Sequence, residues 1–175
     1  MSLRIAFQMD PINKVDVNAD TTFRLIEEAQ RRGHSSYVYE PESLRSDRGE
    51  IIATASSVRV DRNIKEFAKL RNTSDISLKN FDIVWLRQDP PFDMLYITTT
   101  HLLDLISSDV HVVNNPFWVR NFPEKLLVLQ FPKLIPPTLV SRDLVAIKRF
   151  HKDLGEIIIK PLYGNGGEGV FKLGS

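Results

Sequence analysis

A glycine-rich stretch near the end of the chain is the part most suited to chemistry. It reads Gly164-Asn165-Gly166-Gly167-Glu168-Gly169 and comes after the apolar residues 157–159 and Lys160. Glycine allows a close approach of backbone to phosphate and tolerates positive φ, so that successive N–H groups can bind the anion. Lys160 can add a point charge to the same phosphate. The stretch predicts a phosphate-binding loop; the alternative is a mobile hairpin tip beside a surface lysine.

The same letters satisfy the G-x-G-x-x-G dinucleotide fingerprint, but their surroundings do not. That fingerprint requires a helix directly after the glycines and an acidic residue about 20 positions later. Residues 170–175 are typical of the start of a strand instead. No Gly-Lys-Ser/Thr triplet follows, so a P-loop is excluded as well. We therefore expect a strand, a glycine loop and a second strand.

A second group of candidates stands at the ends of predicted strands. Asp10, Arg87, Asp89 and Asn114 each close or follow a short apolar run. Open α/β sheets bind ligands beyond the carboxyl ends of their strands, which makes these four residues candidates for substrate binding. An arginine there can hold a substrate carboxylate with two hydrogen bonds. Alternatively, Arg87 and Asp89 pair with each other and fix the turn at Pro90-Pro91.

The elements that would position these residues alternate between strand and helix up to about residue 122. Apolar runs predict strands at 3–9, 36–39, 83–87 and 111–113, and an accessory strand or hairpin at 51–60. Helices are predicted after the caps Asp20 and Asp93, the first ending at Gly33 and the second covering 94–106. This alternation predicts an α/β fold with a parallel, doubly wound, Rossmann-like sheet.

The pattern changes after residue 122, where we predict a boundary between domains 1–122 and 123–175. Pro123 suits the first turn of a helix at 124–130, and three further prolines make a linker of 132–137. A strand at 138–141, a helix at 143–151 and a strand at 156–160 lead to the glycine loop. This second segment resembles the beginning of a domain rather than a whole one.

Composition excludes several classes of protein. The 175 residues include 23 Lys and Arg against 22 Asp and Glu, so no net charge favours nucleic acid or a membrane surface. There is no cysteine, and the four histidines lack the spacing of a metal site. The apolar runs are far shorter than the ~20 residues of a membrane span. A cytoplasmic protein is the simplest prediction.

Four stretches in order resemble bacterial glutathione synthetases of the ATP-grasp superfamily. The segment "IIIKPLYGNGGEGVF" resembles their nucleotide-binding strand and loop. "MDPI" at 9–12 follows the first strand, "LRQDPPFD" at 86–93 resembles an N-terminal signature, and "VNNPFWVRNFPEKL" at 113–126 resembles the stretch before the ATP-grasp module. The resemblance covers essentially the whole chain, which corresponds to about the first half of such an enzyme.

The resemblance implies an ATP-dependent ligase that joins γ-glutamylcysteine to glycine through an acyl phosphate. Lys125 and Lys160 would then hold the phosphates of ATP, and Gly164, Gly166 and Gly167 would form a mobile loop over them. The alternative for Lys125 is an exposed helix lysine paired with a neighbouring acid. Tyr163 and Asn165 depart from the family's usual Asp and Met, but every glycine and lysine of the motif is present.

The family's magnesium ligands would lie in the half that these 175 residues do not cover. No metal ligand is therefore predicted here, and we expect the chain alone to be inactive. The resemblance also implies self-association into a homo-oligomer. Two other functions stay open: another ATP-grasp carboxylate–amine peptide ligase, and a non-catalytic module for subunit assembly.

Overall fold

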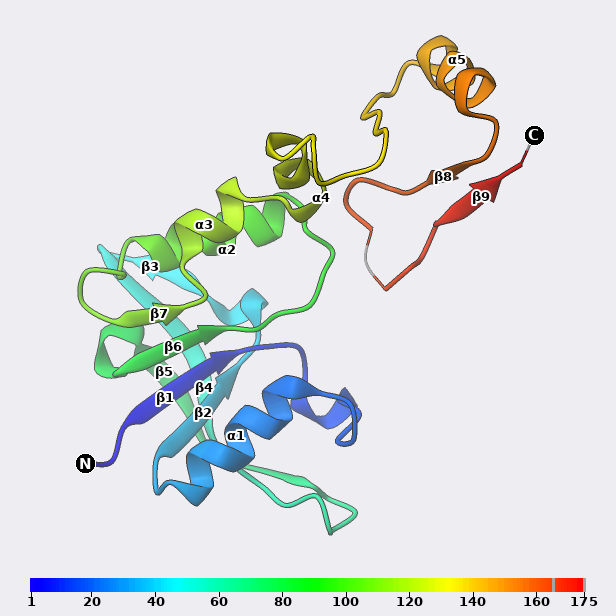
Figure 1. The fold of residues 1–175 in the computed structure, drawn as a ribbon. Helices are drawn as coiled ribbons and strands as arrows, with labels where there is room; N and C mark the ends of the chain where they lie inside the picture. Colours follow the sequence, from blue (N-terminus) through cyan, green and yellow to red (C-terminus); the bar gives the residue numbers. More distant parts are fainter. Residues whose placement is uncertain (165, 175) are drawn as a thin grey trace. The chain divides into compact units, whose positions relative to one another are not determined.

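The computed structural model describes residues 1–164 and 166–174, so Asn165 of the predicted glycine loop lies outside the described residues. The chain divides into two compact units (Figure 1). Unit 1 comprises Met1–Asp89 and Asp93–Asn121, and unit 2 comprises Pro90–Phe92 and the chain from Phe122 onward. Within the described residues, no helix is long and apolar enough to cross a membrane.

Four parallel strands form one side of the sheet in unit 1. Their spatial order is β2-β1-β6-β7, and each neighbouring pair runs parallel. Their bounds are β1 Arg4–Gln8, β2 Ser35–Tyr39, β6 Ile83–Leu86 and β7 His111–Val113. These are the short apolar runs of the sequence, as expected for strands covered on both faces. The predicted α/β fold is confirmed.

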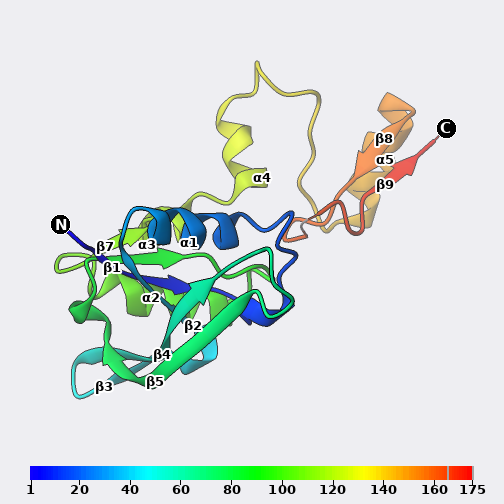
Figure 2. The ribbon, with the colours of Figure 1, turned by 90° about the horizontal axis from the view of Figure 1, so that it is seen from below.

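The sheet continues beyond β2 with antiparallel strands, so it is mixed rather than wholly parallel. β4 (Glu50–Val60) pairs with β2, with β3 (Arg45–Asp47) and with β5 (Ala68–Ser77), antiparallel in each case (Figure 2). The short links from β3 to β4 and from β4 to β5 allow only antiparallel pairing, because a parallel crossover needs a dozen or more residues. The strand or hairpin predicted at 51–60 is therefore confirmed as β4.

Alternate residues of the parallel strands pack against different helices. Ile5 and Phe7 of β1 belong to one buried cluster with Phe23 and Ile26 of α1 (Thr21–Arg31). Ala6, between them, belongs to a second cluster that includes the inner face of α2 (Met94–Asp104). Since successive side chains of a strand point to opposite faces, α1 and α2 cover opposite faces of the sheet.

Both predicted helix starts of unit 1 and the end of α1 are confirmed, whereas α2 ends at Asp104 and not at 106. The Asp20 carboxylate accepts a hydrogen bond from the Phe23 N–H at 2.6 Å, and Asp93 caps α2 in the same manner. Gly33 follows α1 with φ of 79°, a conformation that favours glycine. The remaining short elements of this unit are α3 Pro116–Asn121 and the 3₁₀ turns η1 Ile12–Lys14, η2 Pro41–Ser43 and η3 Leu78–Asn80.

Unit 2 contains short helices and one hairpin. Its elements are α4 Glu124–Leu127, the 3₁₀ turn η4 Val128–Gln130, α5 Leu144–Leu154, β8 Ile157–Ile159 and β9 Phe171–Leu173. Asp143 caps α5, and β8 pairs antiparallel with β9. The strand predicted at 138–141 is wrong: this segment is irregular, and no strand of the described chain pairs with it. An isolated strand leaves its backbone groups unpaired, so its apolar residues alone do not produce one.

Candidate functional site

The carboxyl ends of β1 and β6 form a switch point in the sheet of unit 1. The chain passes from β1 to β2 on one side, whereas β6 lies on the other side of β1. α1 and α2 cover opposite faces, so their connections diverge at this edge. Open α/β sheets bind ligands at such points. Asp10 lies just beyond β1, and Arg87 lies just beyond β6.

Arg87 is held at this edge by hydroxyl groups rather than by an acid. Its Nη2 donates to Thr21 Oγ1 at 2.6 Å, and its Nε donates to Thr22 Oγ1 at 3.1 Å. Its backbone N–H donates to the Gln8 carbonyl at 2.8 Å, continuing the ladder beyond β6. No ion pair joins Arg87 to Asp89 or to another acid among the residues that the structure describes. The Arg87–Asp89 pair of the alternative interpretation is therefore not formed.

Thr21 and Thr22 were not anticipated from the sequence. They are the first two residues of α1, directly after its cap Asp20. Hydroxyl residues near a helix start are ordinary, and nothing local marks them as partners of a residue 65 positions later. Their role comes from the sheet order, which brings the start of α1 to the end of β6.

Asp10 and Asp89 lie together at the switch point. The Asp89 backbone N–H donates to Asp10 Oδ2 at 2.8 Å. Partial burial raises the pKa of the Asp89 carboxyl, and the negative charges of Asp10 and Asp20 raise it further, while Arg87 acts in the opposite direction. Burial likewise raises the pKa of Tyr96 on α2; Arg87 acts against this rise, and the charges of Asp89 and Asp10 add to it. This edge thus holds two carboxylates close to a fixed guanidinium.

Asn114, the fourth candidate, does not share these contacts. It follows β7 across a cis peptide bond from Val113, and its side chain is exposed. Among the described residues, no hydrogen bond links it to Asp10, Arg87 or Asp89. The structure therefore brings three of the four candidates to one switch point and leaves Asn114 at the end of the neighbouring strand.

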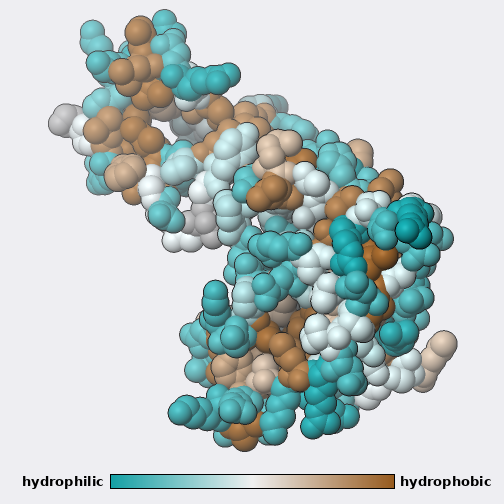
Figure 3. All heavy atoms as spheres, turned by 180° about the vertical axis from the view of Figure 1, so that it is seen from behind, coloured by the Kyte–Doolittle hydropathy of each residue, from teal (hydrophilic) through white to brown (hydrophobic). Residues whose placement is uncertain are grey.

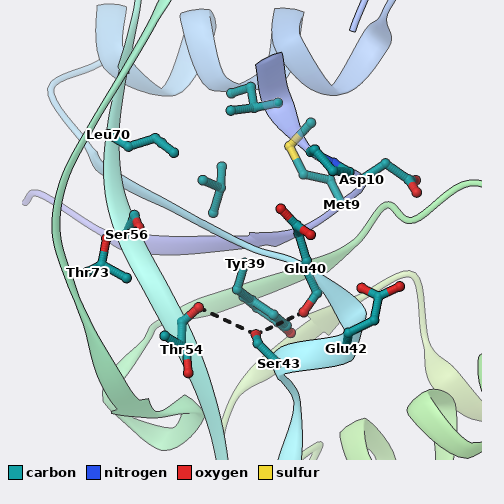
Figure 4. Close-up of a pocket in the computed structure, with 13 residues that line it drawn as sticks. Met9, Asp10, Tyr39, Glu40, Glu42, Ser43, Thr54, Ser56, Leu70 and Thr73 are labelled. Carbon is teal, nitrogen blue, oxygen red and sulfur yellow. Dashed lines mark hydrogen bonds between the residues drawn. The ribbon is translucent and has the colours of Figure 1, made fainter. Parts of the chain in front are cut away.

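A cavity of about 420 Å³ lies on the β1–β2 side of Asp10 (Figure 4). One wall is apolar and includes Met9, Val38 and Leu70. The rim carries the carboxylates of Asp10, Glu40 and Glu42, and no basic residue is among the lining residues that the structure describes. The Ser43 hydroxyl is already used, donating to the Glu40 carbonyl at 2.9 Å. The carboxylates are therefore the polar groups that a cationic ligand would meet.

The glycine loop of unit 2 connects β8 to β9, as expected for a strand–loop–strand motif. Ile157 lies opposite Leu173, and Ile159 lies opposite Phe171. Gly166 and Gly167 adopt φ of 59° and 80°, where side chains other than glycine are strained. No helix follows the loop within residues 166–174, in agreement with the rejection of a dinucleotide fold.

Lys125 and Lys160 stand in different environments. The Lys125 ammonium donates to the Pro161 carbonyl at 2.7 Å and to the Gly164 carbonyl at 2.5 Å. It therefore joins α4 to the loop, instead of pairing with a neighbouring acid as the alternative interpretation held. Lys160 is exposed, and its ammonium has no partner in the described part of the chain. Lys160 is thus a cation at the entrance to the loop that is available to an added anion.

Metal ligands are not grouped in the part of the chain that the structure describes. No set of three or more His, Cys, Asp or Glu residues there could hold an ion. Asp10 and Asp89 make only a pair, and one Asp10 oxygen is occupied by a backbone N–H. These residues therefore do not fit a magnesium site of their own.

Two family models match the chain in succession. Residues 3–120 match the prokaryotic glutathione synthetase N-terminal domain, and residues 124–175 match the prokaryotic glutathione synthetase ATP-grasp domain. The first match includes Asp10, Arg87, Asp89 and Asn114, and the second includes both lysines and the glycine loop.

Curated relatives agree with the family models along the whole chain. A glutathione synthetase of Mesorhizobium japonicum is 47% identical over 173 residues, covering 99% of this chain and 55% of the relative. One of Brucella melitensis is 48% identical over 174 residues, with the same coverage, and one of Xanthomonas axonopodis is 36% identical over 176 residues. The chain thus spans about half the length of the curated relatives it matches. It belongs to the prokaryotic glutathione synthetase family.

Proposed function

We propose that the protein carrying this chain is a glutathione synthase, which uses ATP to join γ-glutamylcysteine to glycine. The observation that carries the proposal is the β8–β9 hairpin, whose glycine loop is held by Lys125 and flanked by Lys160, a residue without an ion-pair partner among those described. A phosphate chain is the ligand that such a loop suits, and family membership supplies the reaction.

The reaction proceeds in two steps, phosphorylation of the dipeptide and then attack by glycine. An oxygen of the dipeptide's cysteine carboxylate attacks the γ-phosphorus of ATP, and the bond from this phosphorus to the bridging oxygen breaks to release ADP. The glycine amine then attacks the acyl carbon, loses a proton, and expels inorganic phosphate as the C–O bond breaks. In phosphoryl transfer the protein contributes chiefly positioning and charge neutralisation.

The residues of unit 2 supply part of that work on the ATP side. Lys160 would pair with a phosphate, and the backbone N–H groups of the glycine loop would donate to its oxygens. Lys125 would set the loop's conformation through the Pro161 and Gly164 carbonyls. Magnesium, which this family implies, finds no set of ligands among the described residues, so we assign it no step.

The residues at the switch point of unit 1 would bind the dipeptide. Arg87 offers a fixed guanidinium to a carboxylate, and Asp10 and Asp89 offer carboxylates to an amine. Asn114 can donate or accept a hydrogen bond at the end of the adjacent strand. These four remain the proposed substrate-binding residues.

The direct test is an assay of the full-length protein with ATP, magnesium, γ-glutamylcysteine and glycine. Glutathione is identified by mass spectrometry, and one ADP is counted for each peptide formed. Failure with this pair, together with ligation of another acid or amine, would favour a different ATP-grasp ligase. Inactivity with every pair, together with self-association in sedimentation velocity, would favour an assembly module.

Lysine variants of the full-length protein test the ATP side. Lys160→Met removes a charge without breaking a contact of the described chain, so we expect the KM for ATP to rise roughly 10–100-fold with folding unchanged. Lys125→Met breaks two hydrogen bonds to the loop, so amide hydrogen exchange in residues 157–173 should accelerate as well. Lys133→Met, an exposed lysine of the same unit, is the control. An unchanged KM in both variants would remove these lysines from the ATP site.

A further inference from the structure

We propose that the switch point of unit 1 recognises a zwitterionic α-amino-acid head. Arg87 binds its carboxylate, and Asp10 with Asp89 binds its ammonium group. This inference rests on the proposed function, because γ-glutamylcysteine carries such a head at its glutamyl end. Neither the family models nor the names of the relatives assign these roles.

The guanidinium of Arg87 is arranged for a ligand. Two threonine hydroxyls fix its Nε and Nη2, and the side chain is half-buried. Its positive charge nevertheless remains without a carboxylate partner within 4.0 Å among the described residues. A planar guanidinium that is already oriented loses little side-chain entropy when it binds a carboxylate. Its remaining N–H groups suit the carboxylate of an amino-acid head.

The two aspartates are arranged for the opposite charge. The hydrogen bond from the Asp89 N–H at 2.8 Å fixes one oxygen of Asp10 and leaves the other available. Neither carboxylate takes part in an ion pair with a described residue. Burial first, and then the charges of Asp10 and Asp20, raise the pKa of Asp89, so Arg87 offsets these like charges only in part. An ammonium group would neutralise them, because it attracts both carboxylates and donates up to three hydrogen bonds.

The charges of both signs at the switch point also determine which end of the dipeptide binds there. A γ-glutamyl dipeptide has a carboxylate and an ammonium on the same carbon at one end, and only a carboxylate at the cysteine end. The acidic pair repels a lone carboxylate, whereas it attracts the ammonium of the head. The glutamyl end is therefore bound here, and the cysteine carboxylate stays available for phosphorylation.

The test uses two analogues that each lack one charge of the head. Glutaryl-cysteine lacks the ammonium, and 4-aminobutyryl-cysteine lacks the head carboxylate. With the full-length wild type we expect kcat/KM to fall roughly 10–100-fold for each, as for the loss of a charged hydrogen bond. In Asp10→Asn the penalty for glutaryl-cysteine should shrink to about threefold or less, while the other penalty persists. Arg87→Gln should show the reverse pattern.

Matched controls separate these effects from general damage. Glu42→Gln removes a carboxylate from the neighbouring cavity rim, and Arg24→Gln removes an exposed arginine of α1; both should keep both penalties. Asp10→Asn should fold, because the amide oxygen that it introduces can still accept the hydrogen bond from the Asp89 N–H. Asp89→Asn provides a second variant of the acidic pair. Circular dichroism checks each fold.

The outcomes distinguish this inference from the proposed function. If the wild type makes glutathione but both penalties are unchanged in Asp10→Asn, Asp89→Asn and Arg87→Gln, the head binds elsewhere and the inference is wrong. If the wild type makes no glutathione, the proposed function is wrong. If the aspartate variants lose only the penalty for glutaryl-cysteine, and Arg87→Gln loses only the penalty for 4-aminobutyryl-cysteine, the assignment of charges is confirmed.

Discussion

The two units differ most in how completely they bury their apolar residues. Unit 1 contains two buried clusters, and Phe23, Ile26 and Leu103 among them have no exposed surface. In unit 2 none of the described residues is buried. Val145 of α5 is 76% exposed and Phe171 of β9 is 64% exposed, and hydrophobic side chains are visible on the surface of this unit (Figure 3).

This difference compares the stability of helices and strands that pack on a buried core with that of helices and strands that do not. Both units have capped helices and paired strands, so local signals are satisfied in both. Burial of apolar surface is the dominant favourable term in folding, at about 25 cal/mol for each Å². Local signals alone leave short helices marginal in water, because nucleation is costly. Unit 1 should therefore behave as a cooperative domain, whereas unit 2 should not.

Separating the units should produce the largest effect. A chain of residues 1–121 should unfold cooperatively in urea, because it retains both buried clusters. A chain of residues 122–175 should show weak far-UV circular dichroism and no cooperative transition. Both tryptophans, Trp85 and Trp118, belong to unit 1, so their fluorescence follows the unfolding of that unit. A sharp transition in the second piece would contradict the comparison.

Matched truncations in the two units should differ by several kcal/mol. Phe23→Ala removes a fully buried ring from unit 1 and should lower its free energy of unfolding by about 3–5 kcal/mol. Leu144→Ala in α5 removes a side chain that is 62% exposed and should change it by less than about 0.5 kcal/mol. Urea denaturation followed by tryptophan fluorescence measures both. Equal losses would show that α5 is packed in solution.

The sequence predicted the elements of unit 1 better than those of unit 2, for the same reason. Runs such as 83–87 and 111–113 are apolar because both faces of the parallel strands are covered. The residues at 138–141 are similarly apolar but have no pairing partner within the described residues, so they do not form a strand. β5 was not predicted, because most of its side chains are exposed and its pairing with β4 is a tertiary property.

In the candidate site, too, tertiary contacts could not be predicted from the local sequence. Strand ends suggested Asp10, Arg87 and Asp89, because the edge of a parallel sheet follows from the order of its elements. Their contacts within the protein could not be predicted in the same way. Asp89 was one possible partner of Arg87, and the structure gives Thr21 and Thr22 instead. Such partners depend on the spatial order β2-β1-β6, which no local pattern encodes.

Removing the side chains that cap helices should change stability by an intermediate amount. The effect should again differ between the two units. Asp20→Ala removes the acceptor for the Phe23 N–H and should lower the stability of unit 1 by about 1 kcal/mol. Asp143→Ala removes the equivalent bond to the Val145 N–H of α5. It should leave the tryptophan-detected transition unchanged and reduce only the helical signal. A shift of that transition by Asp143→Ala would mean that the two units unfold together.

The smallest effect should be a gain in stability from a change within the candidate site. Asp89 has its pKa raised above the ordinary value of 3.8 in the folded chain, first by burial and then by Asp10 and Asp20. The folded state therefore binds this proton more tightly than the unfolded state does, and ionised Asp89 destabilises unit 1. This destabilisation is fully present above the folded pKa and disappears as the pH falls toward 3.8.

Asp89→Asn should consequently stabilise unit 1 at neutral pH, by less than about 1 kcal/mol because the side chain is exposed and water screens it. The difference between variant and wild type should narrow as the pH is lowered toward 3.8. Urea midpoints at several pH values measure it, with the exposed Glu42→Gln as control. A destabilised variant at neutral pH would mean that the protein itself neutralises Asp89, which would also leave no need for an ammonium ligand at the switch point.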